Sequence, residues 1–183
     1  LVYLLFDKVI IGIGLYIERK GILDFVELAK RLPQYKFIWF GYSPLAASPI
    51  EIREAVNTKL DNLVFAGYVE PDVLRGAYSG CDLYLFPTLE ETEGIPIMEA
   101  CAAKIPSLIR DIPVFSEWLV DGVNVHKAKD IDEFEIKIKQ ILEGKLPNLT
   151  KEGYKVAQSR DIKKVGKKLI SVYKQVMDGD VHE

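Results

Sequence analysis

The chain has 183 residues, of which 49 % are apolar and 28 % are charged, and its net charge is −3. This length suffices for one domain with a sizeable core, and the composition is typical of a globular protein in water. The slightly acidic balance argues against a nucleic-acid binder, which would present a basic surface. Cys81 and Cys101 stand in apolar segments and are interpreted as buried filling residues, which favours a reducing, cytoplasmic setting.

The first residues are apolar, but Asp7 and Lys8 interrupt them well before the ~20 residues that a membrane span needs. They contain neither a basic leading segment nor a small-residue cleavage site, so a signal peptide is not expected. Because the chain begins with Leu1 rather than Met, we interpret it as a piece of a longer protein.

Short β-branched apolar runs alternate with helical patterns along the chain. Strands are predicted at residues 8–14, 36–41, 62–67, 82–87, 106–110 and 123–128. Helices are predicted at residues 21–33, 48–56 and 71–80, from near 95, and near 130–143, 149–159 and 161–177. This alternation predicts an α/β fold over residues 1–183, with a Rossmann-like parallel sheet of about six strands and helices on both faces.

In such a sheet, ligands bind beyond the carboxyl ends of the strands. The loops at residues 14–21, 67–71 and 87–96 are therefore expected to form the site. Elsewhere, Ser48, Pro49 and Glu51 match a capping box with proline at the first helical position.

The first of these loops reads "GIGLYIERKG" at residues 12–21. Gly12 and Gly14 match two glycines of the dinucleotide fingerprint, but Ile17 stands where the third should be, so the fingerprint is absent. Arg19 and Lys20 at the end of the first strand suit a phosphate group, which arginine can grip with two hydrogen bonds. The alternative is a solvated turn that carries two surface charges.

The stretch "EETEGIPIMEA" at residues 90–100 allows both a structural and a functional interpretation. Thr88 and Glu91 match a capping box, and Glu99 falls in the first turns of a helix beginning near residue 95, where the dipole favours an acid. Functionally, Gly94 lets a ligand approach the backbone, and the free N–H groups of the helix start can hold a phosphate. Carboxylates on either side accept hydrogen bonds from vicinal hydroxyls, a combination that suits a nucleotide sugar.

Three segments together resemble one family. "LFPTLEETEGIPIMEACAAKIP" is similar to the E-x7-E motif of the group 1 retaining glycosyltransferases of the GT-B fold. "FAGYVEPDVLRGAYSGCDLYLFP" resembles the family's G-x-V segment, and "YIERKGILDFVELAKRLP" resembles its K-G segment on the phosphate side. The resemblance covers about residues 9–142, and the positions that fall on the main motif are Glu91, Gly94, Pro96, Glu99, Ala100, Ala102 and Pro106.

The resemblance implies roles for particular residues. Glu91 beside the donor sugar and Lys20 at the diphosphate are the implied catalytic residues, and Glu99 is the implied acid for the ribose. Gly94 and Ile95 would offer backbone N–H groups to the sugar and diphosphate. The full implied substrate-binding set is Gly14, Arg19, Tyr68, Val69, Glu93, Gly94, Ile95, Pro96 and Glu99.

Three departures from the family pattern stand out. Leu15 occupies the position of the family's arginine after the first-strand glycine, and Arg19 is a candidate to replace it. Thr92 and Glu93 precede Gly94 where the family has G-F-G, so Glu93 is either a further sugar contact or a solvated charge. Residues 110–111 are Arg-Asp in place of Gly-Gly, a combination most like the branch that glucosylates diacylglycerol in bacteria.

The implied protein is the C-terminal, donor-binding domain of a hexosyltransferase. It would use a nucleotide diphosphate sugar, with a UDP-sugar favoured, and no metal. The N-terminal acceptor domain would lie outside this chain and would bind a lipid or glycan, at the cytoplasmic face of a membrane. One alternative is a non-catalytic or degenerate nucleotide-sugar-binding module, favoured by Leu15. Another is a sugar-nucleotide epimerase, against which the pairing of Glu91 with Glu99 argues.

The remaining signals are weaker. Asp130 and Asp132 are interpreted as caps and dipole partners of a helix start rather than as metal ligands. His126 is expected to be structural. The last predicted helix has one lysine-rich face and one apolar face, with Lys163, Lys164, Lys167 and Lys168 opposite Ile162, Val165, Leu169, Val172 and Val176. It would either pack on the core or contact anionic lipid head groups.

Overall fold

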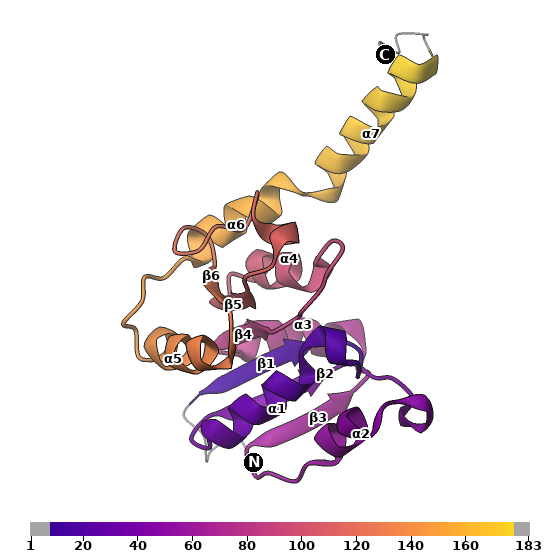
Figure 1. Ribbon diagram of the computed structural model, residues 1–183. Coiled ribbons are helices and arrows are strands. Elements are labelled where there is room, and N and C mark those ends of the chain that lie inside the picture. The colour runs from indigo at the N-terminus through magenta and orange to yellow at the C-terminus, as the bar shows by residue number, and fades with distance from the viewer. Residues whose placement is uncertain (1–7, 178–183) are drawn as a thin grey trace.

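The computed structural model describes residues 8–177, and its centre is a six-stranded sheet (Figure 1). The strands are β1 (Val9–Ile13), β2 (Lys36–Phe40), β3 (Leu63–Gly67), β4 (Leu83–Phe86), β5 (Ser107–Arg110) and β6 (His126–Ala128). All neighbours pair in parallel in the order β3-β2-β1-β4-β5-β6. The predicted Rossmann-like fold is therefore confirmed.

Burial explains why the central strands are almost uninterrupted apolar runs. Every residue of β2 and β4 is buried, as expected for strands covered on both faces. In the edge strand β3, exposed residues instead alternate with residues that are buried or partly buried, because one of its faces is left open. A continuous apolar run in the sequence thus indicates a covered central strand, whereas alternation indicates the edge strand.

Two layers of helices cover the sheet (Figure 1). α1 (Ile22–Arg31), α2 (Ile50–Asn57) and α5 (Ile131–Leu142) enclose one core, in which the rings of Phe25, Phe37 and Trp39 meet edge to face. α3 (Pro71–Gly80), α4 (Ile95–Ala102) and α6 (Thr150–Ser159) enclose the other core, around Tyr84, Phe86 and Phe115.

Two helix starts differ in how they are capped. Asp130 caps α5 as predicted, since its side chain accepts a hydrogen bond from the Glu133 N–H. The capping box predicted for α2 is wrong: that helix begins at Ile50, and the Ser48 hydroxyl donates to the Pro44 carbonyl instead. A local 3-10 turn at Leu45–Ala47 takes the serine away from the helix.

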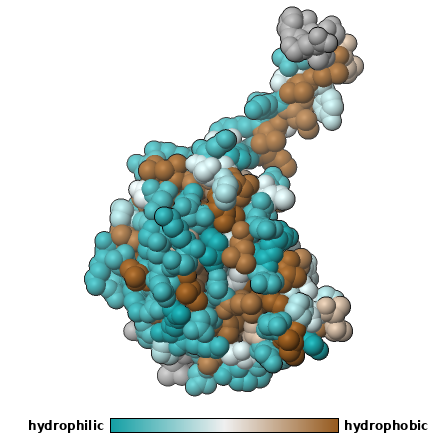
Figure 2. Space-filling model, viewed as in Figure 1, coloured by the Kyte–Doolittle hydropathy of each residue, from teal (hydrophilic) through white to brown (hydrophobic). Residues whose placement is uncertain are grey.

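α7 (Ile162–Met177) projects away from the rest of the molecule (Figure 1). It has no buried residue, and Figure 2 shows its apolar side chains on the surface. The interpretation that this helix lays its apolar face on the core is therefore wrong for the described part of the chain. Within residues 8–177, no helix is both long and apolar enough to cross a membrane.

Candidate functional site

The loops after β1 and β4 meet at the carboxyl edge of the sheet. β1 and β4 are neighbours, and the chain moves outward from β1 towards β3 and from β4 towards β6. The gap between their loops is thus the switch point at which ligands bind in open α/β sheets.

Hydrogen bonds tie these two loops together. The Leu89 N–H donates to the Arg19 carbonyl at 2.8 Å, and the Arg19 guanidinium donates to the Glu90 carbonyl at 3.3 Å. Gly21 has a φ of 75°, and a Cβ there would lie 2.2 Å from the Pro87 carbonyl oxygen. Only glycine allows this approach, so Gly21 lets the first loop reach the second.

The two glycines of the incomplete fingerprint are explained by packing. A Cβ on Gly12 would come within 2.8 Å of both the Phe25 and the Trp39 rings. A Cβ on Gly14 would meet the Lys20 side chain at 3.1 Å, and the Gly14 carbonyl accepts a hydrogen bond from the Trp39 indole. Gly14 therefore leaves room for Lys20 at the edge of the sheet.

Lys20 and Glu91 form an ion pair at this edge. The Lys20 Nζ lies 2.6 Å from Glu91 Oε2, and the two side chains are only 14 % and 8 % exposed. Burial by itself would raise the pKa of Glu91, but hydrogen bonds from Lys20 and from the Thr92 N–H, with the charges of Lys20 and Arg19, lower it overall. Glu91 is therefore a carboxylate at neutral pH.

The capping interpretation of Glu91 is wrong. No helix begins at residues 88–91, and Glu91 Oε1 accepts its hydrogen bond from the adjacent Thr92 N–H. The Thr88 hydroxyl is buried and has no hydrogen-bond partner among residues 8–177. Glu91 thus bonds within its own loop, and neither side chain caps a helix start.

α4 begins at the same edge with free N–H groups. Its cap residue, Gly94, has a φ of 78°, and a Cβ there would lie 2.8 Å from the Phe115 ring. Ile95 and Pro96 open the helix, and its first turn contains no acidic residue. The N–H groups of a first turn have no acceptor within the helix and can bind an anion.

Glu99 lies in the second turn of α4, which begins at Ile95, so its expected place in the first turns of that helix agrees with the structure. Its Oε2 accepts a hydrogen bond from the Tyr78 hydroxyl at 3.0 Å. Glu99 and Tyr78 line an open groove of about 410 Å³ between α3 and α4, with Pro71, Leu74, Arg75, Ser79, Ala102 and Ala103.

The remaining predicted residues lie around these groups. Tyr68 follows β3 and is 74 % exposed, whereas Val69 is partly buried. Leu15 and Glu93 are exposed. No hydrogen bond or ion pair of the described residues joins the side chains of Tyr68, Glu93 or Glu99 to the Lys20–Glu91 pair.

Two residues of this edge were not predicted from the sequence. Tyr78 holds Glu99, and its only sequence signal is a tyrosine in a helix that precedes a buried strand. Arg110, at the end of β5, is buried and donates to the Pro87 and Lys129 carbonyls and to the Asp24 carboxylate. It fixes the backbone where β4 leaves the sheet.

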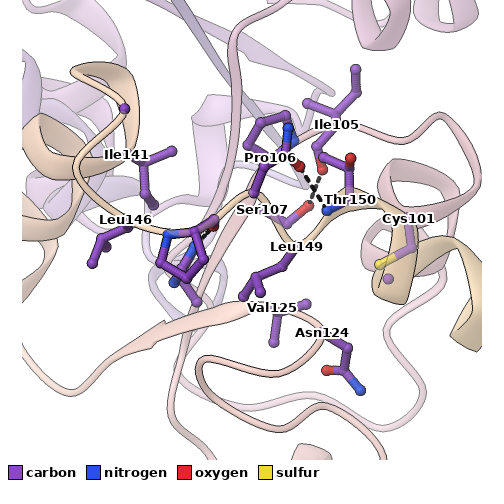
Figure 3. A pocket seen from close by; sticks show the side chains of 15 residues that line it. Cys101, Ile105, Pro106, Ser107, Asn124, Val125, Ile141, Leu146, Leu149 and Thr150 are labelled. Carbon is purple, nitrogen blue, oxygen red and sulfur yellow. Dashed lines mark hydrogen bonds between the residues drawn. The ribbon is translucent and has the colours of Figure 1, made fainter.

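A second, more enclosed pocket lies at the opposite edge. It measures about 140 Å³, and His126 at the start of β6 is one of the residues that line it. Ser107, at the start of β5, also lines it (Figure 3). Leu149 and Val125 give it a largely apolar wall (Figure 3). Its place at the amino ends of the strands separates it from the Lys20–Glu91 edge.

Cys101 and His126 are buried, and Cys81 is partly buried. Burial raises the pKa of the Cys81 thiol to about 12 and that of Cys101 to about 11, so neither is a reactive thiolate. Among residues 8–177, no three His, Cys, Asp or Glu side chains form a group that could hold a metal ion.

Comparison with solved structures shows the same fold. One is the Anabaena protein Alr3699/HepE in complex with UDP and glucose, with a TM-score of 0.77 and 18 % identity over 92 % of this chain and 48 % of that one. Another is the C-terminal domain of a group 1 glycosyl transferase from Francisella tularensis. It has a TM-score of 0.65 and 20 % identity, and the match covers 86 % of this chain and 88 % of that domain.

Sequence comparison adds the family. The chain is 42 % identical over 171 residues to a processive diacylglycerol alpha-glucosyltransferase of Acholeplasma laidlawii. That match covers 93 % of this chain and 52 % of the relative, so the chain spans about half of that relative's length. The family model described as glycosyl transferases group 1 matches residues 6–160. Because this model matches most of the chain, and the chain has the fold of GT-B glycosyltransferases, the chain belongs to the group 1 glycosyltransferases.

Proposed function

We propose that this chain is the donor-binding domain of a retaining hexosyltransferase that takes a nucleotide diphosphate sugar. Its main support is the Lys20–Glu91 ion pair, which places a cation and a carboxylate beside the free N–H groups of α4. A diphosphate needs the cation and the N–H groups, and sugar hydroxyls need the carboxylate.

The diphosphate would take Lys20 as its partner. Lys20 compensates the buried charge of Glu91. As the bond from the hexose to the diphosphate breaks, negative charge grows on the leaving group, and Lys20 with the α4 N–H groups would stabilise it. Arg19 is close by, because its guanidinium contacts the Glu90 carbonyl, and it would add positive charge in place of Leu15. This proposed chemistry needs no metal ion.

The nucleoside would lie between α3, α4 and the loop after β3. Glu99 faces the groove there and would accept hydrogen bonds from the ribose hydroxyls. Tyr68 and Val69 would border the base. A uridine nucleotide is the favoured donor, and the Anabaena structure with the same fold was solved with UDP and glucose.

The acceptor would be bound by protein outside this chain. The Acholeplasma relative is named for diacylglycerol glucosylation and is about twice as long as the matched segment. We therefore propose a membrane glycolipid as the acceptor class, and a cytoplasmic protein at the membrane surface. The chain alone is expected to bind donor without transferring sugar, and measurable turnover by the isolated chain would contradict this.

α7 supports the membrane part of this proposal. It carries Lys163, Lys164, Lys167, Lys168 and Lys174 and no acid from Ile162 to Met177, and its apolar side chains are exposed. A basic helix with an apolar face binds anionic lipid surfaces. The chain should therefore sediment with vesicles of anionic lipid and not with neutral vesicles. Replacement of Lys163, Lys164, Lys167 and Lys168 by glutamine should abolish this. Equal binding of the quadruple variant would exclude α7 as the contact.

The main alternative is a binding module without catalytic activity. Leu15 favours it, because an exposed apolar side chain stands where the family pattern has an arginine. The two proposals differ in one measurement: the complete protein containing this chain should transfer hexose and lose that activity in Glu91→Gln, whereas a binding module should show no transfer.

Calorimetric titration of the chain with UDP, UDP-glucose and a GDP-sugar tests donor binding directly. We expect binding of UDP and UDP-glucose, and a loss of about tenfold or more in affinity in Glu99→Ala, as when a charged hydrogen bond is removed. Glu54→Gln, on α2 and on the other face of the sheet, is the matched control and should bind as the wild type does. Absence of binding to every nucleotide would refute the proposal.

A further inference from the structure

Tyr78 stands out because its hydroxyl touches a residue of the proposed site. It lies on α3 and is 4 % exposed, and it is the buried residue of that helix. Its hydroxyl lies 3.0 Å from Glu99 Oε2 and 3.1 Å from the Pro96 carbonyl oxygen. A tyrosine hydroxyl carries one hydrogen, so the two acceptors on α4 share a single donor.

The phenol can only act as a donor here. Burial raises the pKa of Tyr78, and the charge of the neighbouring Glu99 carboxylate raises it further. The ring is also fixed, since it packs against Tyr84 with a centroid separation of 5.7 Å. A rigid, protonated hydroxyl thus faces one oxygen of Glu99.

The other oxygen of Glu99 is left for a ligand. Glu99 is exposed on the groove side of α4, and Oε1 accepts no hydrogen bond from the described residues. An exposed glutamate otherwise samples several rotamers, and ordering it on binding costs affinity. The Tyr78 hydrogen bond selects one orientation before the ligand arrives.

We propose that Tyr78 is a positioning residue that presets the Glu99 carboxylate for the ribose hydroxyls of the donor nucleotide. This rests on the proposed donor-binding function and adds a specificity determinant to it: Tyr78 sets how strongly the site prefers a ribonucleotide to its deoxy analogue. A site built to hydrogen-bond a hydroxyl rejects the analogue that lacks it.

The test compares the affinities of UDP and 2′-deoxy-UDP by calorimetry for the wild-type chain, Tyr78→Phe and Tyr84→Phe. The wild type should prefer UDP by roughly tenfold or more. Tyr78→Phe should bind UDP more weakly and 2′-deoxy-UDP about as well as the wild type, so that the preference shrinks to about twofold to threefold. Tyr84→Phe removes a buried neighbouring hydroxyl that has no partner among residues 8–177, and it should keep the full preference.

Each other outcome has a definite meaning. Equal weakening of both nucleotides by Tyr78→Phe would show a merely structural role and overturn the inference. The inference would also be overturned if Tyr78→Phe kept the full preference for UDP over 2′-deoxy-UDP while Glu99→Gln lost that preference. The donor-binding proposal would still stand in that case. A wild-type chain that binds neither nucleotide would overturn the proposed function itself.

Discussion

At the scale of single residues, Lys20 and Glu91 form a buried ion pair in which removal of either charge is expected to cost stability. The two side chains come from loops 71 positions apart and are 14 % and 8 % exposed. Removal of one partner of a buried pair leaves an uncompensated charge, which costs more than the pair contributes. The pair therefore holds the Lys20 ammonium group beside the Glu91 carboxylate.

Lys20→Met should lower the free energy of unfolding by about 2 kcal/mol at pH 7, because Glu91 loses its partner. The loss should shrink in the Lys20→Met, Glu91→Gln double variant, which has no buried charge at this position. Urea unfolding of the four proteins of this cycle measures the coupling. Additive effects would contradict a direct ion pair.

The same pair has a pH dependence with a definite sign. The pKa of Glu91 is lowered in the folded protein, so its contribution to stability is present above its usual pKa of 4.5. That contribution is lost as the pH falls through the lowered value. The coupling measured in the cycle should therefore persist at pH 5 and vanish in strong acid.

Gly21 is the residue that makes contact between the loops possible. Gly21→Ala should destabilise the chain by about 3 kcal/mol or more, for two reasons. The new Cβ would clash with the Pro87 carbonyl, and alanine would have to adopt a positive φ that is unfavourable for it. Gly67→Ala is the matched control: Gly67 has a similar φ of 72°, but nothing lies within 4 Å of its Cβ position. It should lose only about 1 kcal/mol. Equal losses in thermal or urea unfolding would show that the clash with Pro87 is unimportant.

At the scale of elements, the sequence predicts well what depends on local pattern and on topology. Residues 37–40 of β2 form an apolar run that is typical of a strand covered on both faces, and the parallel order brings the loops of β1 and β4 together. The expectation that Arg19 and Lys20 come to the edge of the Glu91 loop follows from that topology. Their contacts with the Glu90 carbonyl and with Glu91 agree with it.

The contacts that the sequence could not predict depend on how neighbouring helices pack against each other. The bond from Tyr78 to Glu99 joins two helices whose separation and rotation are set by packing around Tyr84 and Ile97. The capping patterns at Ser48 and Thr88 failed for a related reason. The loop conformation determines where each of these hydroxyls lies. The helix that follows begins only where the loop ends, which a four-residue sequence pattern does not predict.

Among residues 8–177, the one histidine is His126 on β6, and histidine is the side chain that ordinarily titrates near neutrality. His126 is buried, and its Nε2 lies 3.0 Å from the Pro147 carbonyl oxygen, to which a neutral ring can donate. Burial lowers the pKa of His126 below its usual 6.5, and the charge of Lys137 lowers it further. The Pro147 carbonyl and Asp121 raise the pKa, but they do not offset the effect of burial.

The folded state therefore disfavours the imidazolium, and stability is complete above pH 6.5 and lost as the pH falls through the lowered pKa. Chemical unfolding at pH 7.5, 6.5 and 5.5 should show a falling free energy for the wild type and a flatter profile for His126→Gln. His182→Gln replaces the other of the two histidines and should keep the wild-type profile. A flat wild-type profile would contradict a neutral buried His126.

At the scale of the whole molecule, the described chain divides into a packed body and one projecting helix. α6 still belongs to the body: Gly153 is buried, and a Cβ there would approach the Asn124 carbonyl at 3.0 Å and the Cys101 sulfur at 3.4 Å. α7 follows directly, yet none of its residues from Ile162 to Met177 is buried. A helix of this length without packing partners is marginally stable in water.

Truncation at this boundary separates the two parts. A chain ending after Asp161 should unfold within about 2 °C of the full chain, because it loses no buried apolar contact. A chain ending before Thr150 should unfold at a much lower temperature, since it also loses the packing of Gly153 and Val156 of α6 on α4 and its neighbours. The first truncation should also lose binding to anionic vesicles while it keeps UDP binding, because the proposed donor site lies wholly before α5. A large drop in unfolding temperature on removal of α7 alone would mean that this helix packs on the body in solution. The apolar face of α7 would then no longer support the proposed contact with a membrane.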